Sequence, residues 1–180
     1  RQRGSGATLN IDISRPQPEM QTDIPRLRDG GVGAQFWSVY VPNSTAYNGT
    51  ALATTLEQIE LVKTNIKRYP ETFELALTAD DIERVHGSKK IASLIGIEGG
   101  YSIEESLSVL NRLYEIGARY MTLTHADALS WADSATDEPR HGGLTPFGED
   151  VVREMNRLGM MVDLSHVSVD TMKDTLAITR

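Results

Sequence analysis

The sequence predicts an α/β fold, a (β/α)8 barrel of the TIM type of which this chain covers roughly the first half. Strand-like and helix-like segments alternate along the chain, which is typical of βα units and a parallel sheet. The run "SLIGI" at 93–97 is apolar on both faces, as buried parallel strands are. Four strands are expected, whereas a closed barrel needs eight strands and typically ~250 residues.

The first part of the chain contains one predicted strand and two predicted helices. Residues 1–31 are polar and rich in Gly and Pro, which predicts a loop leading into a short helix near Asp23–Arg28. The β-branched and aromatic residues at 32–41 predict a strand, and 42–49 predicts a loop. Apolar residues at helical spacing from Leu52 to Ile66 predict a helix of about four turns.

In the middle of the chain the alternation becomes regular. Thr78 is expected to cap a helix that runs to about Val85. "KIASLIGIEGG" at 90–100 predicts a strand followed by two glycines. Ser102 with Glu105 three residues later matches a capping box and predicts the start of the next helix.

The last part continues this pattern after a long connection. A strand is predicted at 119–125 and a loop at 126–143. Thr145, an expected N-cap followed by a proline, predicts a helix that a glycine closes. A strand is predicted at 160–166, and Ser168 is the expected cap of the following helix.

Composition restricts the classes of function. Hydrophobic residues make up 39% and charged residues 24% of the 180 residues, as in soluble globular proteins. The net charge of −7 argues against a nucleic-acid-binding surface. The sequence has no cysteine, so a transition-metal site would have to use His, Asp and Glu. No apolar stretch approaches the ~18 residues that indicate a membrane span.

Three potentially reactive side chains occupy equivalent positions in successive βα units. Glu98, His125 and His166 each lie at the C-terminal end of a predicted strand. In parallel α/β folds these ends form the mouth of the ligand site, so the three side chains are expected to converge. Each alone could be a cap, an ion-pair partner or a solvated histidine. Together, two imidazoles and a carboxylate suit Zn²⁺ or a similar divalent ion.

Other polar residues have more ordinary interpretations. The simplest interpretation of His86 is a solvated residue at a helix end, and that of His141 is a surface residue. Asp127 and Asp133 are interpreted as residues that order the loop. Asp163 could brace a histidine or form an ion pair. The motifs HExxH, GxSxG, the P-loop and GxGxxG are absent, so zincin, serine-hydrolase and nucleotide-binding functions have no support.

Long segments of the sequence resemble a known family. "IGIEGGYSIEESLSVLNRLYEIGARYMTLTH" and "GLTPFGEDVVREMNRLGMMVDLSHVS" resemble the membrane (renal-type) dipeptidases, peptidase family M19, within the metal-dependent amidohydrolase-like barrels. "QTDIPRLRDGGVGAQFWSVYVP" resembles the region after that family's first metal motif. The resemblance extends from about Ile11 to Arg180.

The resemblance implies a barrel hydrolase with two zinc ions bridged by Glu98, in which a bridging hydroxide attacks the amide of a dipeptide. His166 then matches a ligand of the second zinc. His125 matches the histidine that contacts substrate and tetrahedral intermediate, which departs from the pattern-based expectation that all three residues bind metal. Paired cations lower the pKa of bound water and stabilise the developing oxyanion.

The sequence also departs from the family pattern. The family's His-x-Asp pair for the first zinc, which ends its first strand, has no counterpart; the His-x-Asp at His125–Asp127 lies in the segment that matches a later strand. The family's later metal ligand, aspartate and arginine also have no counterpart. Tyr101 stands where many members carry His. These departures predict that residues 1–180 form part of one longer barrel domain, inactive alone because two ligands cannot make a tight two-zinc site.

The leading expectation is therefore a zinc dipeptidase when intact. The alternatives are a non-catalytic small-molecule-binding barrel that has lost its metal site, and another barrel amidohydrolase whose specificity is set by the 126–143 loop with Trp131. The expected partner is a dipeptide, with a homodimer possible and with no nucleic acid or evident membrane contact. The absence of cysteine suits a cytoplasmic bacterial-type protein, although membrane-anchored relatives exist in the family.

Overall fold

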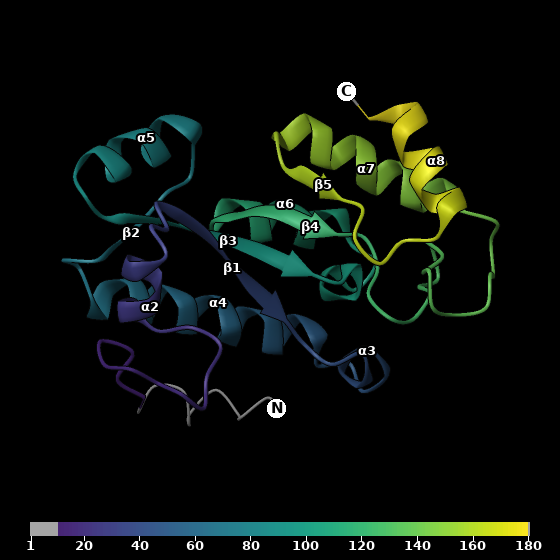
Figure 1. The fold of residues 1–180 in the computed structure, drawn as a ribbon. Helices are drawn as coiled ribbons and strands as arrows, with labels where there is room; N and C mark the ends of the chain where they lie inside the picture. The colour runs from purple at the N-terminus through teal and green to yellow at the C-terminus, as the bar shows by residue number, and fades with distance from the viewer. Residues whose placement is uncertain (1–10, 180) are drawn as a thin grey trace. The chain divides into compact units, whose positions relative to one another are not determined.

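The structure, a computed structural model, describes residues 11–179 (Figure 1). The chain divides into two compact units, one comprising Arg1–Trp37 with Glu57–Leu94 and the other Ser38–Leu56 with Ile95–Arg180. The first ten positions of the loop expected at 1–31 lie outside the described residues. The extent of a single barrel domain stays a prediction.

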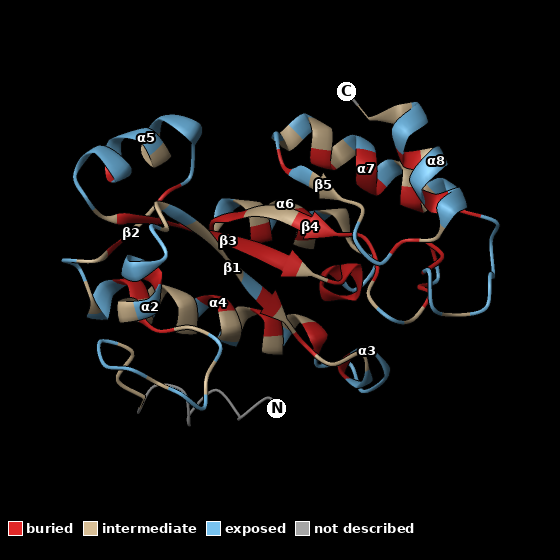
Figure 2. Ribbon diagram, viewed as in Figure 1, coloured by how far each residue is buried: buried red, intermediate tan, exposed pale blue. Residues whose placement is uncertain are grey.

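Three long elements run from one unit into the other. They are β1 (Ala34–Tyr40), α4 (Ala51–Arg68) and β3 (Ile91–Glu98). The first seven residues of β3 are buried, as Figure 2 shows by its red colour. The apolar run that predicted a strand buried on both faces is thus confirmed.

The first unit contains α2 (Ile24–Asp29), β2 (Phe73–Leu75) and α5 (Ala79–Gly87). Thr78 caps α5, as the sequence predicts, and does so within a complete capping box, while Asp23 caps α2. The strand β2 pairs in parallel with β3 but was missed, because three residues are too few to show a periodicity. The unit has a core formed by Leu27, Ile66, Phe73 and Ile91.

The second unit holds the remaining strands and helices. The C-terminal half of β3 pairs in parallel with β4 (Ala118–Thr122), and β4 pairs in parallel with β5 (Met161–Asp163). The helices are α3 (Ser44–Tyr47), α6 (Leu107–Glu115), α7 (Pro146–Leu158) and α8 (Val169–Ile178). α6 packs against β4 and α7 against β5, and α7 lies beside both α6 and α8 (Figure 1).

The predicted capping box at Ser102 and Glu105 is wrong. The chain forms a 3-10 turn (η1, Gly100–Ile103), and α6 is capped by Ser106 instead. Glu104 and Glu105 both adopt left-handed backbone conformations with φ of 46° and 55°, which cannot continue a helix. Their side chains serve tertiary contacts, because Glu104 accepts from the Leu52 N–H at the start of α4 and Glu105 accepts from the Ser130 hydroxyl.

Smaller differences concern the ends of the elements. The loop expected at 42–49 contains the single helical turn α3. Strands β4 and β5 are shorter than predicted, so His125 and His166 lie in the loops that follow these strands. The helices predicted to start after Thr145 and Ser168 are confirmed, with both hydroxyls accepting backbone N–H groups.

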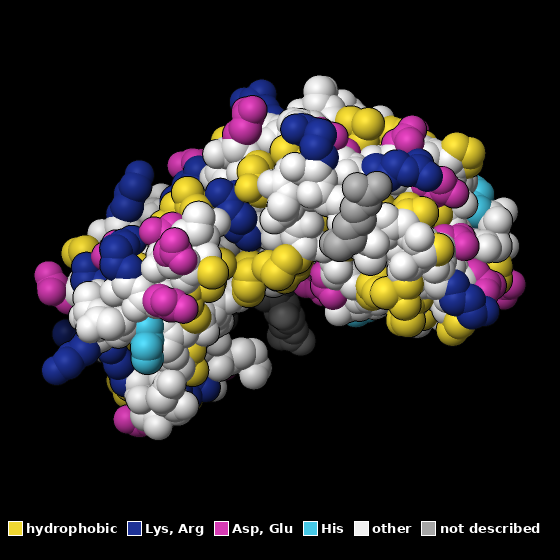
Figure 3. Space-filling view, turned by 90° about the horizontal axis from the view of Figure 1, so that it is seen from above, with side chains coloured by type: hydrophobic (Ala, Val, Ile, Leu, Met, Phe, Trp, Pro, Cys, Tyr) yellow, Lys and Arg dark blue, Asp and Glu magenta, His cyan; other side chains and the backbone are white. Residues whose placement is uncertain are grey.

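Part of the second unit's surface is apolar. Met161 of β5 and Val169, Met172 and Leu176 of α8 are exposed. Figure 3 shows hydrophobic side chains among charged ones on the side of this unit that carries α7 and α8. Within residues 11–179 no helix has both the length and the apolar character needed to cross a membrane.

Candidate metal centre

The three predicted site residues converge in the second unit. Glu98 is the last residue of β3, while His125 and His166 begin the connections after β4 and β5. Because the three strands are parallel neighbours, their carboxyl ends lie at one edge of the sheet. One ligand atom from each side chain lies within 4.8 Å of the other two.

Both imidazoles face the same carboxylate oxygen. Nε2 of His125 lies 3.5 Å and Nε2 of His166 lies 3.4 Å from Oε1 of Glu98. The two rings are stacked at a tilt, with centroids 4.5 Å apart. The Tyr40 ring, 4.7 Å from His125, packs on that histidine. The side chains of Glu98 and His125 are about one quarter exposed, so the cluster is open to solvent.

His166 has an unusual backbone. Its φ is +68°, a left-handed conformation that costs a non-glycine residue free energy and is common at functional sites. Two groups hold its carbonyl oxygen in place, the Ala135 N–H at 2.8 Å and the Thr124 hydroxyl at 3.1 Å. The 126–143 loop therefore fixes the direction in which the His166 side chain leaves the chain.

The donor set fits a divalent cation. Zinc binds imidazole nitrogen and carboxylate oxygen at about 2.0–2.2 Å, which places tetrahedral donors about 3.3 Å apart. The separations of 3.5 and 3.4 Å between Oε1 of Glu98 and the two histidine nitrogens approach that value with the side chains as they stand. The second oxygen of Glu98, Oε2, accepts a hydrogen bond from Ser38 at 2.7 Å and keeps a free lone pair.

The glycines after Glu98 serve packing. Gly99 has φ of +112°, and a Cβ there would lie 2.5 Å from the ring of Tyr101. A Cβ on Gly100 would lie 2.5 Å from both the Leu123 carbonyl oxygen and the Trp131 ring. Burial, and then the nearby Tyr40, Glu98 and Asp127, raise the pKa of Tyr101, so this phenol stays protonated.

Most of the other polar residues have the structural roles that their ordinary interpretations predict. His86 and His141 are exposed, and Nε2 of His141 lies 3.0 Å from the Leu129 carbonyl oxygen. Asp133 binds backbone N–H groups of its own loop. Asp163 accepts from Thr122 and from the backbone and hydroxyl of Ser165, and within residues 11–179 it makes no hydrogen bond to an imidazole, although the nearby His166 helps to lower its pKa.

Sequence reasoning missed the residues that support the cluster. Ser38 and Tyr40 lie two apart on β1 and so share one face, and they contact Glu98 and His125 respectively. The period-two pattern could have grouped them, but nothing in the sequence says which strand lies beside β3. Thr124 was likewise read only as part of a strand.

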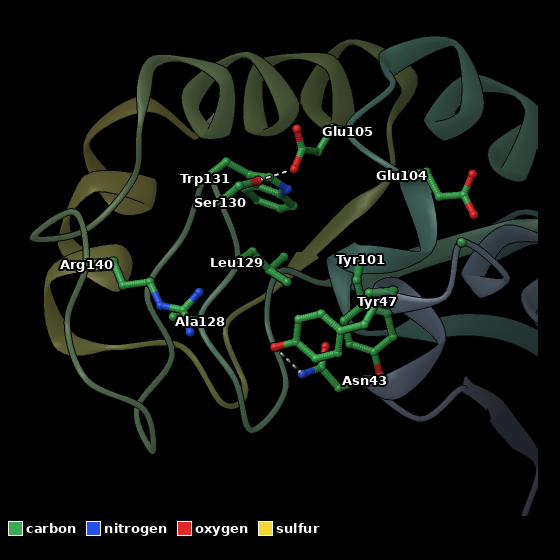
Figure 4. Close-up of a pocket in the computed structure, with 12 residues that line it drawn as sticks. Asn43, Tyr47, Tyr101, Glu104, Glu105, Ala128, Leu129, Ser130, Trp131 and Arg140 are labelled. Atoms are coloured by element: carbon green, nitrogen blue, oxygen red, sulfur yellow. Dashed lines mark hydrogen bonds between the residues drawn. The ribbon is translucent and has the colours of Figure 1, made fainter.

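A separate cavity of about 540 Å³ opens in the second unit (Figure 4). None of the three cluster residues lines it. The walls come from the α3 region, from η1 and from the loop after β4, and they include Tyr47, Tyr101, Glu105, Trp131 and Arg140. Trp131, which was expected to set specificity from the loop, is itself buried and contributes one wall.

Comparisons with known proteins identify the family and the fold. The family described as membrane dipeptidase (peptidase family M19) matches residues 5–180. Dipeptidase 3 of Mus musculus is 49% identical over 165 residues, covering 89% of this chain and 32% of that protein. Dipeptidase verJ of Clonostachys rogersoniana is 46% identical over 169 residues, covering 88% of this chain and 44% of that protein. The chain thus spans between about a third and a half of these relatives.

Solved structures show the same fold. The probable dipeptidase PvdM from Pseudomonas aeruginosa aligns with a TM-score of 0.80 at 20% identity, over 89% of this chain and 44% of that one. A metallo peptidase from Rhodobacter sphaeroides, liganded with a phosphinate mimic of the dipeptide L-Ala-D-Ala, aligns with a TM-score of 0.80 at 20% identity, over 93% of this chain and 56% of that one. The predicted fold class is confirmed, with the chain covering part of the barrel. The chain belongs to the membrane dipeptidase family, peptidase family M19.

Proposed function

We propose that the protein carrying this chain is a zinc-dependent dipeptidase, and that Glu98 and His166 hold metal in its active site. The observation that supports this most is the convergence of Glu98, His125 and His166 at one sheet edge in a member of a metallopeptidase family. The relatives named as dipeptidases are 46–49% identical to this chain, which extends the proposal to a dipeptide substrate.

The metal chemistry follows from the donors. A bound divalent ion polarises the scissile carbonyl and lowers the pKa of water. Glu98 would be suited to hold two such ions, because its carboxylate has two oxygens, of which Oε1 faces the histidines and Oε2 accepts from Ser38. The count of two zinc ions, taken from the family resemblance, is part of the proposal.

His125 is assigned a different role from His166. We infer that His125 contacts the substrate and stabilises the charge that develops on its carbonyl oxygen. The rings of Tyr40 and His166 both pack against the His125 imidazole and restrain it, so a proton on Nε2 has a defined direction. The geometry is equally compatible with three ligands to one ion, so the two assignments need a direct test.

The test compares three alanine variants of the purified protein by metal analysis and by dipeptide hydrolysis. Glu98→Ala should lose bound zinc and activity together, and His166→Ala should lower the zinc content. His125→Ala should retain zinc while kcat/KM falls by about 10²–10³-fold, as for removal of an oxyanion-stabilising group. His86→Ala is the matched control, since this histidine is exposed and lies in the first unit.

The outcomes separate the candidate functions. Loss of zinc from His125→Ala would make this residue a ligand and contradict its substrate role. A wild-type protein of known intact mass that binds no metal and hydrolyses no dipeptide would contradict the proposal and favour a binding protein. A homodimer and a cytoplasmic location, both expected from the sequence, stay predictions that size-exclusion chromatography and cell fractionation can check.

A further inference from the structure

The two oxygens of the Glu98 carboxylate have different neighbours. Oε1 faces the two histidines at 3.4–3.5 Å. Oε2 accepts a hydrogen bond of 2.7 Å from the hydroxyl of Ser38 on β1. A glutamate at a strand end has several staggered rotamers, and this hydrogen bond selects the one in which Oε1 points at the imidazoles.

Ser38 is itself held by a second side chain. Tyr120 of β4 forms a hydrogen bond with Ser38, and β4 pairs Tyr120 with Gly96 of β3. A Cβ on residue 96 would lie 2.0 Å from the Tyr120 ring, so only glycine leaves room for this ring. Gly96, Glu98 and the ring of Tyr120 thus share one face of the sheet.

The hydrogen bond between Ser38 and Glu98 can have only one direction. An ionised carboxylate can only accept. Ser38 therefore donates to Oε2 of Glu98, while Tyr120 lies in hydrogen-bond contact with the same serine.

We propose that Ser38 is a positioning residue that, supported by Tyr120 over Gly96, turns the Glu98 carboxylate toward His125 and His166. This inference rests on the proposed metal site for its functional consequence, but the orientation of Glu98 can be measured without metal. Groups that orient a ligand in this way typically affect metal affinity by 10–100-fold when they are removed. Because Ser38 is exposed, the expected loss is about tenfold, at the low end of that range.

The experiment uses Ser38→Ala, Ser38→Thr and a control, Ser102→Ala. Ser102 is a buried serine of η1 whose hydroxyl has no hydrogen-bond partner among residues 11–179, so its removal should change neither readout. The first readout is zinc affinity, measured by competition with a chromophoric chelator. The second is the side-chain conformation of Glu98 in crystal structures of the metal-free wild type and Ser38→Ala.

The expected result is a Ser38→Ala protein that folds, binds zinc about tenfold more weakly and shows Glu98 turned away from the histidines. Ser38→Thr, which keeps the hydroxyl, should restore affinity. Unchanged zinc affinity together with an unmoved Glu98 overturns the inference. A wild type without zinc affinity, in which Glu98 nevertheless moves in Ser38→Ala, would refute the proposed metal function and support the positioning role.

Discussion

Asp133 is the buried carboxylate that organises the loop after β4, and its removal should destabilise the protein. Its side chain accepts from the backbone N–H groups of Arg140 (2.8 Å), His141 (3.1 Å) and Gly143 (3.0 Å). Asp133 is 1% exposed. Asp133→Ala would leave all three donors without their acceptor at once.

The magnitude follows from these three bonds. A hydrogen bond to a charged group contributes about 1.5–3 kcal/mol, so three give an upper bound of about 4.5–9 kcal/mol. Arg140 and His141 are exposed and can bond to water in the variant, whereas Gly143 is buried. We therefore expect a loss of about 2–4 kcal/mol, or roughly 4–16 °C in Tm for a chain of this size.

The assay is urea and thermal unfolding followed by circular dichroism, with Asp150→Ala as the control. Asp150 is an exposed acid on α7 whose contact is a surface ion pair with Arg153, so its removal should cost less than about 1 kcal/mol. A change in Asp133→Ala no larger than that of the control would refute the argument that this carboxylate organises the loop.

The pH dependence provides a second check on Asp133. Burial opposes ionisation, but the backbone N–H groups outweigh it and hold the pKa of Asp133 below its ordinary value. A carboxyl group with a lowered folded pKa contributes stability above its unfolded pKa, near 4, and this contribution is lost as pH falls through the folded pKa. The difference in stability between wild type and Asp133→Asn should therefore shrink below about pH 4.

Two further substitutions test the packing around the cluster. Gly96→Ala should lower the free energy of unfolding in urea by about 1–3 kcal/mol, because the new Cβ would lie 2.0 Å from the Tyr120 ring. The control is Gly87→Ala, whose Cβ would meet no neighbouring atom within 4 Å among the described residues. An equal loss in the two variants would contradict this prediction. Thr124→Val removes one of the two hydrogen-bond donors to the His166 carbonyl oxygen and should lower the free energy of unfolding by about 1 kcal/mol in the same assay. An unchanged urea midpoint would show that the Ala135 N–H alone is sufficient to hold this carbonyl.

Local patterns in the sequence were enough to place most elements. The caps at Thr78, Thr145 and Ser168 are confirmed because each depends on a side chain and a backbone N–H only a few residues away. The apolar run before Glu98 predicted a buried strand because a segment without polar side chains has no solvent-facing side. The convergence of Glu98, His125 and His166 followed from the rule that parallel strands end at one edge.

The failures share one physical cause. The capping box predicted at Ser102 does not form because Glu104 and Glu105 bond to Leu52 and Ser130, which lie far away in the sequence. Ser38 and Tyr120 could not be connected with Glu98 from the sequence, since their contacts depend on which strands are neighbours and on their register. Residue chemistry and local hydrogen bonds thus predict the elements and the reactive side chains. The orientation of those side chains depends on hydrogen bonds between distant segments, which exist only once the sheet has assembled.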